Sequence, residues 1–145
     1  VKYTAPTHFE IGRIKAEIGP DFRVFSGADE MAMSGLAFGA DGLIGSFYNI
    51  IPELYADIVA AMAEGRIADA KALQDKANAI IFFTLKQYPM SAVKRIMAWQ
   101  GADAGYCRKP FDNYETPEAE AALKDAYRAF RDAHGLAEIG FLPDL

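Results

Sequence analysis

The sequence predicts an α/β fold, the carboxyl-terminal half of a TIM (β/α)8 barrel followed by a helical region. Three short apolar segments lie about 20 residues apart with helical patterns between them, which is the spacing of βα units in a parallel sheet. From Pro52 onward the patterns are helical throughout. Three strands cannot close a barrel, whereas eight can, so we expect the other strands to precede Val1 or to come from another chain.

The first 50 residues are expected to hold three strands and two helices. The strands are predicted at 1–4, 22–26 and 42–46. Thr7 and Glu10 have the Thr-x-x-Glu spacing of a capping box, which predicts a helix start there and a helix end at Gly19-Pro20. A second helix follows the turn "GADE" and ends at Gly39.

The remainder of the chain, about 52–145, is expected to be mainly helical. Pro52 suits a first helical position, and Thr116 before Pro117 has the residue types of a helix start. No low-complexity linker interrupts the chain, so residues 1–145 are predicted to be the carboxyl-terminal part of a single domain. The helices are predicted at 52–64, 67–88, 90–100 and 117–134.

Composition argues against several classes of partner. The net charge is −5 and the basic residues form no block, which disfavours binding to nucleic acid or to an anionic membrane surface. No apolar stretch is long enough to span a bilayer. Cys107 is the single cysteine, so no internal disulfide is possible and a cytoplasmic location is expected. His8, His134 and Cys107 do not have the spacing of a zinc site, so no metal is expected.

Polar or small residues follow each predicted strand. In barrels of alternating strands and helices, function collects at the carboxyl ends of the strands. Each residue also has a simpler explanation: a strand lysine commonly faces solvent, and acids in a first helical turn interact favourably with the helix dipole. The candidate site residues are Lys2, Thr4, Gly27, Asp29, Glu30 and Ser46.

Together these residue types suit carbon–carbon bond cleavage in a sugar-like keto acid. A barrel interior disfavours a charged lysine and favours a neutral amine, which can attack a ketone and form a Schiff base. Asp29 and Glu30 would accept hydrogen bonds from the hydroxyls of a polyol and would repel a second carboxylate.

Four segments, "VKYT", "SGADE", "GADGLIGSFYN" and "CRKPF", resemble the second half of enzymes in the dihydrodipicolinate synthase / N-acetylneuraminate lyase family. The resemblance runs in order from Val1 to about Phe111. It implies a class I aldolase that cleaves N-acetylneuraminate or a related sugar keto acid to pyruvate and an aldehyde sugar. In that family the lysine of the first segment forms a Schiff base with pyruvate, which matches Lys2, and no cofactor or metal is used.

The resemblance also implies the roles of the other candidate residues. Thr4 matches a threonine that lines the pyruvate pocket. The residues matching those that bind the hydroxylated part of the substrate are Gly27, Asp29, Glu30 and Ser46. The family's proton-shuttling tyrosine and its Gly-Thr-Thr-Gly-like carboxylate-binding loop belong to earlier strands. Tyr3 is no substitute, because neighbours in a strand point to opposite faces.

We therefore expect residues 1–145 to need the amino-terminal half of the barrel for activity. A homotetramer is expected, as is usual in the family, and the apolar residues on more than one face of 67–100 agree with an oligomer interface.

Alternative functions are suggested by residues that differ from the family pattern, and one alternative belongs to a different class of protein. Ala28 and Phe47 stand where such lyases often have an aromatic residue and a threonine, so the preferred sugar acid is open. Within the family, the alternatives are a dihydrodipicolinate synthase, disfavoured by the acids at 29–30, and a 2-keto-3-deoxy sugar acid aldolase or dehydratase. A non-catalytic paralogue or assembly module is the alternative outside enzymes, and the strand lysine disfavours it.

Overall fold

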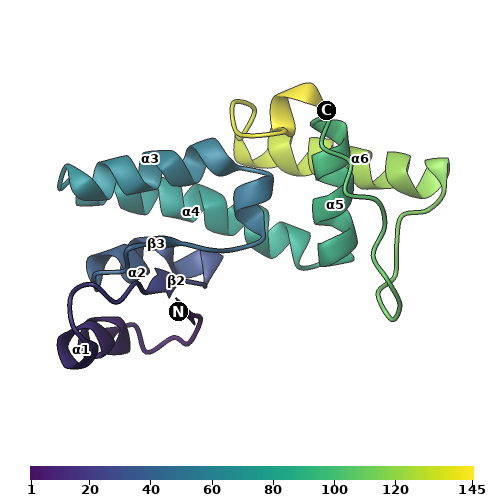
Figure 1. Ribbon diagram of the computed structural model, residues 1–145. Coiled ribbons are helices and arrows are strands. Elements are labelled where there is room, and N and C mark those ends of the chain that lie inside the picture. Colours follow the sequence, from purple (N-terminus) through teal and green to yellow (C-terminus); the bar gives the residue numbers. More distant parts are fainter.

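The computed structural model describes residues 1–145 and has a small α/β part followed by a larger helical part (Figure 1). The sheet has three parallel strands in the order β1-β2-β3. Lys2 pairs with Phe25, and Phe25 pairs with Gly42. The strands are β1 (Lys2–Tyr3), β2 (Phe25–Ser26) and β3 (Gly42–Leu43).

The strands lie where the sequence predicts them but are shorter than the predicted ranges. The ladder continues slightly beyond each strand, since the Gly27 N–H donates to the Tyr3 carbonyl at 2.7 Å and the Ile44 N–H donates to the Ser26 carbonyl at 2.9 Å. Only β2 has a neighbour on both edges. A strand with one neighbour has half of its backbone groups unpaired, which limits how far regular pairing extends.

Two helices and a short 3-10 turn accompany the sheet. Helix α1 spans Phe9–Ile18, and the turn η1 (Asp29–Met31) leads into helix α2 (Ala32–Ala37). The predicted capping box is wrong: His8 is the residue before α1, and no side chain caps the helix. The Thr7 hydroxyl instead bonds the Tyr3 hydroxyl at 2.7 Å, so it is not available for the backbone of α1.

Asp41 joins α1 to the start of the sheet. Its carboxylate accepts hydrogen bonds from the Lys15 amine at 2.7 Å, the Val24 N–H at 2.8 Å and the Arg23 guanidinium at 3.0 Å. The Lys15 hydrogen bond, followed by the Val24 N–H, holds the pKa of the Asp41 carboxyl well below its usual range. This carboxylate therefore stabilises the fold in its charged form.

Replacing Asp41 by asparagine is expected to lower the free energy of unfolding at pH 7. Because the folded-state pKa is depressed, the contribution of the carboxylate is fully present above the unfolded-state pKa of about 3.9, begins to decline below it, and is lost completely only below the folded-state pKa. The difference between Asp41→Asn and the unchanged protein should therefore shrink in acid. Urea unfolding at pH 7 and pH 3 checks this, and equal stability of the two proteins at pH 7 would contradict it.

The second part of the chain forms four long helices and ends in a short 3-10 turn, η3 (Leu142–Asp144). Pro52 occupies the first turn of its helix, and the Thr116 side chain accepts a hydrogen bond from the Ala119 N–H, so both predicted helix starts are confirmed. The helices are α3 (Pro52–Ala63), α4 (Ile67–Thr84), α5 (Pro89–Trp99) and α6 (Pro117–His134).

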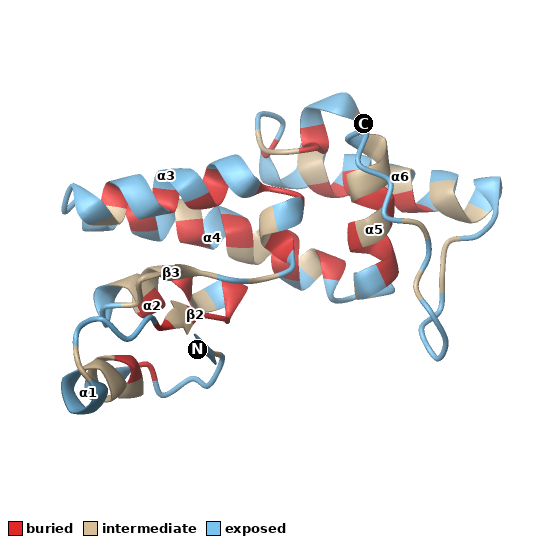
Figure 2. Ribbon diagram, viewed as in Figure 1, coloured by how far each residue is buried: buried red, intermediate tan, exposed pale blue.

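The main core lies among these helices, and their buried residues face one another (Figure 2). Helices α3 and α4 pack side by side, and α4 also contacts η1 and α2 (Figure 1). The buried Thr84 and Tyr127 hydroxyls join α4 to α6 at 2.6 Å. None of the helices is both long and apolar enough to span a lipid bilayer. Helix α4 thus connects the helical core to the loops that follow the strands.

Candidate active site

A hollow of about 260 Å³ lies at the carboxyl ends of the three strands. All six residues predicted from the sequence line it. The others that line it are Ala28, Gly45, Phe47, Ile81 and Leu85. The structure therefore brings together side chains from three separate strand ends and adds an apolar wall from α4 and the segment that follows it.

Gly27 makes room for the two residues of the first strand end. A Cβ at this position would overlap Thr4 Oγ1 and lie 2.5 Å from Lys2 Cε. Lys2 and Thr4 are two residues apart in extended chain and so share one face, while Tyr3 points away and bonds Thr7. Gly27 is thus needed for the lysine side chain to lie across the neighbouring strand end.

The dry barrel interior expected around Lys2 is not formed by residues 1–145. Lys2 and Thr4 are exposed, because β1 has a neighbour on one edge only. The amine makes no hydrogen bond to a protein group. Residues 1–145 therefore place the lysine in the hollow but do not remove it from solvent.

Asp29 is buried and connects two strand-end loops. Its side-chain Oδ2 accepts a hydrogen bond from the Phe47 N–H at 2.8 Å, and a Cβ at Gly45 would overlap its carboxyl group. Burial raises the pKa of the Asp29 carboxyl, and the Phe47 N–H partly opposes that rise. This connecting role was not predicted from the sequence. The one feature that could have indicated it is Gly45, because a glycine allows another group to approach the backbone closely.

Glu30 and Ser46 lie at the rim of the hollow. Both are exposed, and the Ser46 side chain makes no capping hydrogen bond to the short 3-10 turn η2 (Phe47–Asn49). Phe47 is 8% exposed and belongs to the helical core, so its ring serves packing. The groups free to bind a hydroxylated ligand are therefore the Glu30 carboxylate and the Ser46 hydroxyl, with the second Asp29 oxygen beside them.

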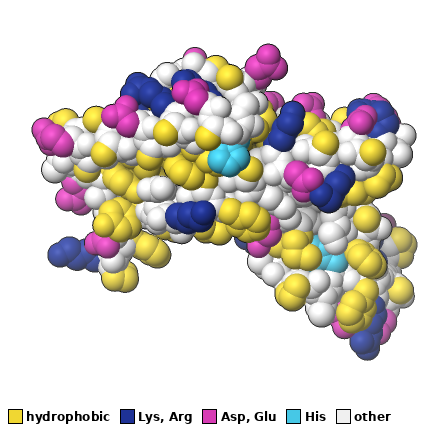
Figure 3. Space-filling view, turned by 180° about the vertical axis from the view of Figure 1, so that it is seen from behind, with side chains coloured by type: hydrophobic (Ala, Val, Ile, Leu, Met, Phe, Trp, Pro, Cys, Tyr) yellow, Lys and Arg dark blue, Asp and Glu magenta, His cyan; other side chains and the backbone are white.

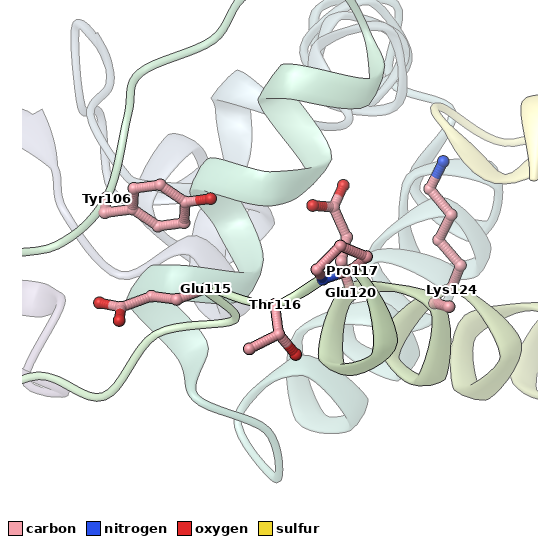
Figure 4. A pocket seen from close by; sticks show the side chains of 7 residues that line it. Tyr106, Glu115, Thr116, Pro117, Glu120 and Lys124 are labelled. Atoms are coloured by element: carbon pink, nitrogen blue, oxygen red, sulfur yellow. The ribbon is translucent and has the colours of Figure 1, made fainter.

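A second hollow, of about 380 Å³, lies between α6 and the loop before it (Figure 4). Two of its polar groups are already used: Thr116 caps α6, and Glu120 accepts a hydrogen bond from the Trp99 indole at 2.5 Å. It contains none of the residues predicted for the site. No group of three or more His, Cys, Asp or Glu side chains is placed to hold a metal ion.

Residues 1–129 match the profile of the dihydrodipicolinate synthetase family. The chain belongs to this family. An N-acetylneuraminate lyase of Rhizobium meliloti is 36% identical over 126 residues, which are 87% of this chain and 42% of that protein. The family predicted from the four sequence segments is therefore confirmed.

Solved structures similar to this chain agree with the fold. CdNal from Clostridium difficile in complex with mannosamine has a TM-score of 0.78 at 30% identity, over 90% of this chain and 44% of that one. KD(P)GA from T. tenax has a TM-score of 0.76 at 30% identity, over 92% and 46%. The predicted partial barrel with a helical region is confirmed, and the chain spans less than half the length of these similar proteins.

Proposed function

We propose that residues 1–145 form the substrate-binding half of a pyruvate-dependent class I aldolase that cleaves N-acetylneuraminate or a related sugar keto acid. The observation that supports this most strongly is the shared hollow, in which the Lys2 amine and the Asp29–Glu30 pair meet at the strand ends. The R. meliloti relative carries the name of this activity. The enzyme assembled from residues 1–145 and the remaining barrel strands is called the assembled enzyme below.

Lys2 is proposed to act as the nucleophile. Its neutral amine attacks the keto carbon, water leaves, and a protonated imine forms. The bond between the α carbon and the hydroxyl-bearing β carbon then breaks: its electron pair forms the enamine double bond between the α carbon and the imine carbon, while the hydroxyl of the departing β carbon loses its proton and becomes the aldehyde. Protonation of the enamine and hydrolysis of the imine release pyruvate and restore the lysine.

The proton transfers require a group outside residues 1–145. The resemblance assigns this role to a tyrosine of the amino-terminal half, and Tyr3 is bonded to Thr7 and does not line the hollow. The sugar hydroxyls are proposed to donate hydrogen bonds to the carboxylates of Asp29 and Glu30 and to exchange hydrogen bonds with the Ser46 hydroxyl. Thr4 is proposed to line the pyruvate end of the hollow beside Lys2.

The assembled enzyme is proposed to be a homotetramer. Large apolar side chains of α4 that do not line the hollow stay exposed in residues 1–145, including Phe82 at 52% and Ile67 at 50%. Figure 3 shows hydrophobic side chains at several places on the rear face, among interspersed basic and acidic ones. We expect sedimentation equilibrium at micromolar concentration to give the tetramer mass, and a monomer mass would contradict it. A cytoplasmic location stays a prediction from the single cysteine.

A second candidate is a 2-keto-3-deoxy sugar acid aldolase or dehydratase, which the likeness to KD(P)GA favours. The acids at 29–30 disfavour a dihydrodipicolinate synthase, whose aldehyde partner is anionic, because Glu30 is exposed at the rim of the hollow. Both alternatives use the same lysine imine, so they differ in the part of the site that binds the second substrate.

Substrate assays of the assembled enzyme test the proposal. We expect release of pyruvate from N-acetylneuraminate, with a 2-keto-3-deoxy sugar acid as the competing substrate. Cleavage or dehydration of the second substrate alone would select the second candidate. Neither pyruvate release nor dehydration with either substrate would favour a non-catalytic paralogue or assembly module.

A further inference from the structure

Gln74 is a buried glutamine on α4 that faces the backbone of the acid-bearing turn. It is 5% exposed, although glutamine is usually a surface residue. Its Oε1 accepts a hydrogen bond from the Met33 N–H at 2.9 Å, and its Nε2 donates to the Asp29 carbonyl at 3.2 Å. One amide thus bridges the two ends of the segment that carries Glu30.

The chemistry of these partners requires one orientation of the amide. A backbone N–H can only donate and a backbone carbonyl can only accept, so exchanging the amide oxygen and nitrogen would break both bonds. The remaining Nε2 hydrogen is directed to Asn78 Oδ1 at 3.0 Å, one turn further along α4. Gln74 is therefore held in place and presents a donor and an acceptor at fixed positions.

A second helix, α3, also donates a hydrogen bond to the backbone of the acid-bearing turn. The hydroxyl of Tyr55, on α3 and 4% exposed, donates to the Asp29 carbonyl at 3.2 Å. The Asp29 carbonyl therefore receives one hydrogen bond from each of two packed helices. With Met33 also bound, the turn η1 cannot rotate without breaking buried hydrogen bonds.

We propose that Gln74 is a positioning residue that sets the direction of the Asp29 and Glu30 carboxylates toward the hydroxyls of the sugar substrate. It touches no substrate itself and acts through the backbone of Asp29 and Met33. This inference rests on the proposed function, because it assigns the acid pair to the sugar end of the hollow and Lys2 to the pyruvate end.

Gln74→Met in the assembled enzyme tests the sugar end of the hollow separately from the pyruvate end. Methionine has a similar length but has neither the amide donor nor its acceptor, so both bridging bonds are lost. We expect kcat/KM for the sugar keto acid to fall roughly tenfold, which corresponds to about 1.4 kcal/mol. The rate at which borohydride traps the pyruvate imine on Lys2 should stay within about twofold of the unchanged enzyme, since pyruvate does not contact the acid pair.

Thr84→Val is the matched control on the same helix. It removes the buried hydrogen bond to Tyr127 and should lower thermal stability, as Gln74→Met does, but it leaves the 29–33 segment untouched. We expect kcat/KM for the sugar keto acid to be unchanged in this variant. A purely structural role of Gln74 would make the two variants behave alike.

Gln74→Glu adds a pH signature that packing alone does not give. Above the pKa of the introduced carboxyl, both of its oxygens are acceptors, and one of them faces the Asp29 carbonyl. Once protonated, the group again has one donor and one acceptor and can remake both bonds. The loss of kcat/KM relative to the unchanged enzyme should therefore diminish between pH 8 and pH 5.

Two failures can be distinguished. If the unchanged enzyme neither forms the Lys2 adduct nor releases pyruvate, the proposed function is wrong. If it does both, while Gln74→Met keeps the full kcat/KM for the sugar keto acid, or loses imine trapping to the same extent, the positioning role of Gln74 is wrong.

Discussion

Replacing Lys2 by alanine or arginine is expected to abolish turnover of the assembled enzyme and its labelling by pyruvate with borohydride. In the proposed mechanism the imine is the electron sink for carbon–carbon cleavage, and an arginine guanidinium stays protonated and cannot form it. Lys2 is the only lysine that lines the strand-end hollow. Mass spectrometry after reduction should find the pyruvate adduct on Lys2, and the variants should keep the fold because the side chain is exposed.

Glu30→Gln is the control for this prediction. It keeps the size of the side chain and should leave pyruvate labelling intact, while it weakens the use of the hydroxylated substrate by about 1–3 kcal/mol. Asp29→Ala should also keep labelling, but it would in addition leave the Phe47 N–H without its acceptor. An adduct on Lys71 or Lys94, whose amines bond Asp75 and two backbone carbonyls, would contradict the assignment to Lys2.

Gly45→Ala is expected to destabilise the protein and remove activity together. The added Cβ would overlap the Asp29 carboxyl, so either the loop at 45–47 moves or Asp29 leaves the Phe47 N–H. Overpacking and a lost buried hydrogen bond each cost about 1–3 kcal/mol, so whichever of the two occurs should lower the free energy of unfolding by about 1–3 kcal/mol. Urea unfolding measures the first effect, and substrate cleavage measures the second.

Gly12→Ala is the matched glycine control. Gly12 lies within α1, and a Cβ there would be 3.6 Å from the Phe38 carbonyl oxygen, which is an ordinary contact. Alanine is favoured over glycine inside a helix by about 0.5–1 kcal/mol, so this variant should be as stable as the unchanged protein or slightly more so. Equal free energies of unfolding for Gly45→Ala and Gly12→Ala would mean that the close approach of Gly45 to Asp29 does not affect stability.

The sequence predicted the positions of the strands, the helix starts at Pro52 and Thr116, and the polar residues and Gly27 that line the hollow, but not the apolar wall from Ile81 and Leu85. These features depend on local sequence patterns and on the rule that the carboxyl ends of parallel strands lie together at one end of the sheet. The capping box at Thr7 was wrong because the Thr7 hydroxyl bonds the Tyr3 hydroxyl, a contact that the sequence pattern does not reveal, although the helix begins close by, at Phe9.

The contacts that hold the acid pair were also missed. Gln74 and Asp29 are 45 residues apart, and glutamine on a helix is ordinarily a solvated residue. Burial of that one position depends on how α4 packs over η1, which local sequence does not determine. The connection between Asp29 and Phe47 was missed for the same reason, because it joins two loops through a backbone N–H.

The bridge from α4 to η1 has a consequence for the order of folding. The contact between Val24 and Asp41 spans 17 residues, whereas the contact between Asp29 and Gln74 spans 45. Closing a longer loop costs more chain entropy, about 0.6 kcal/mol for each doubling of its length. During synthesis, the three strand segments also leave the ribosome well before α4 does. We therefore expect the turn with Asp29 and Glu30 to reach its final geometry only after α4 has docked, and the proposed sugar-binding end of the hollow to form later than the contact between Val24 and Asp41.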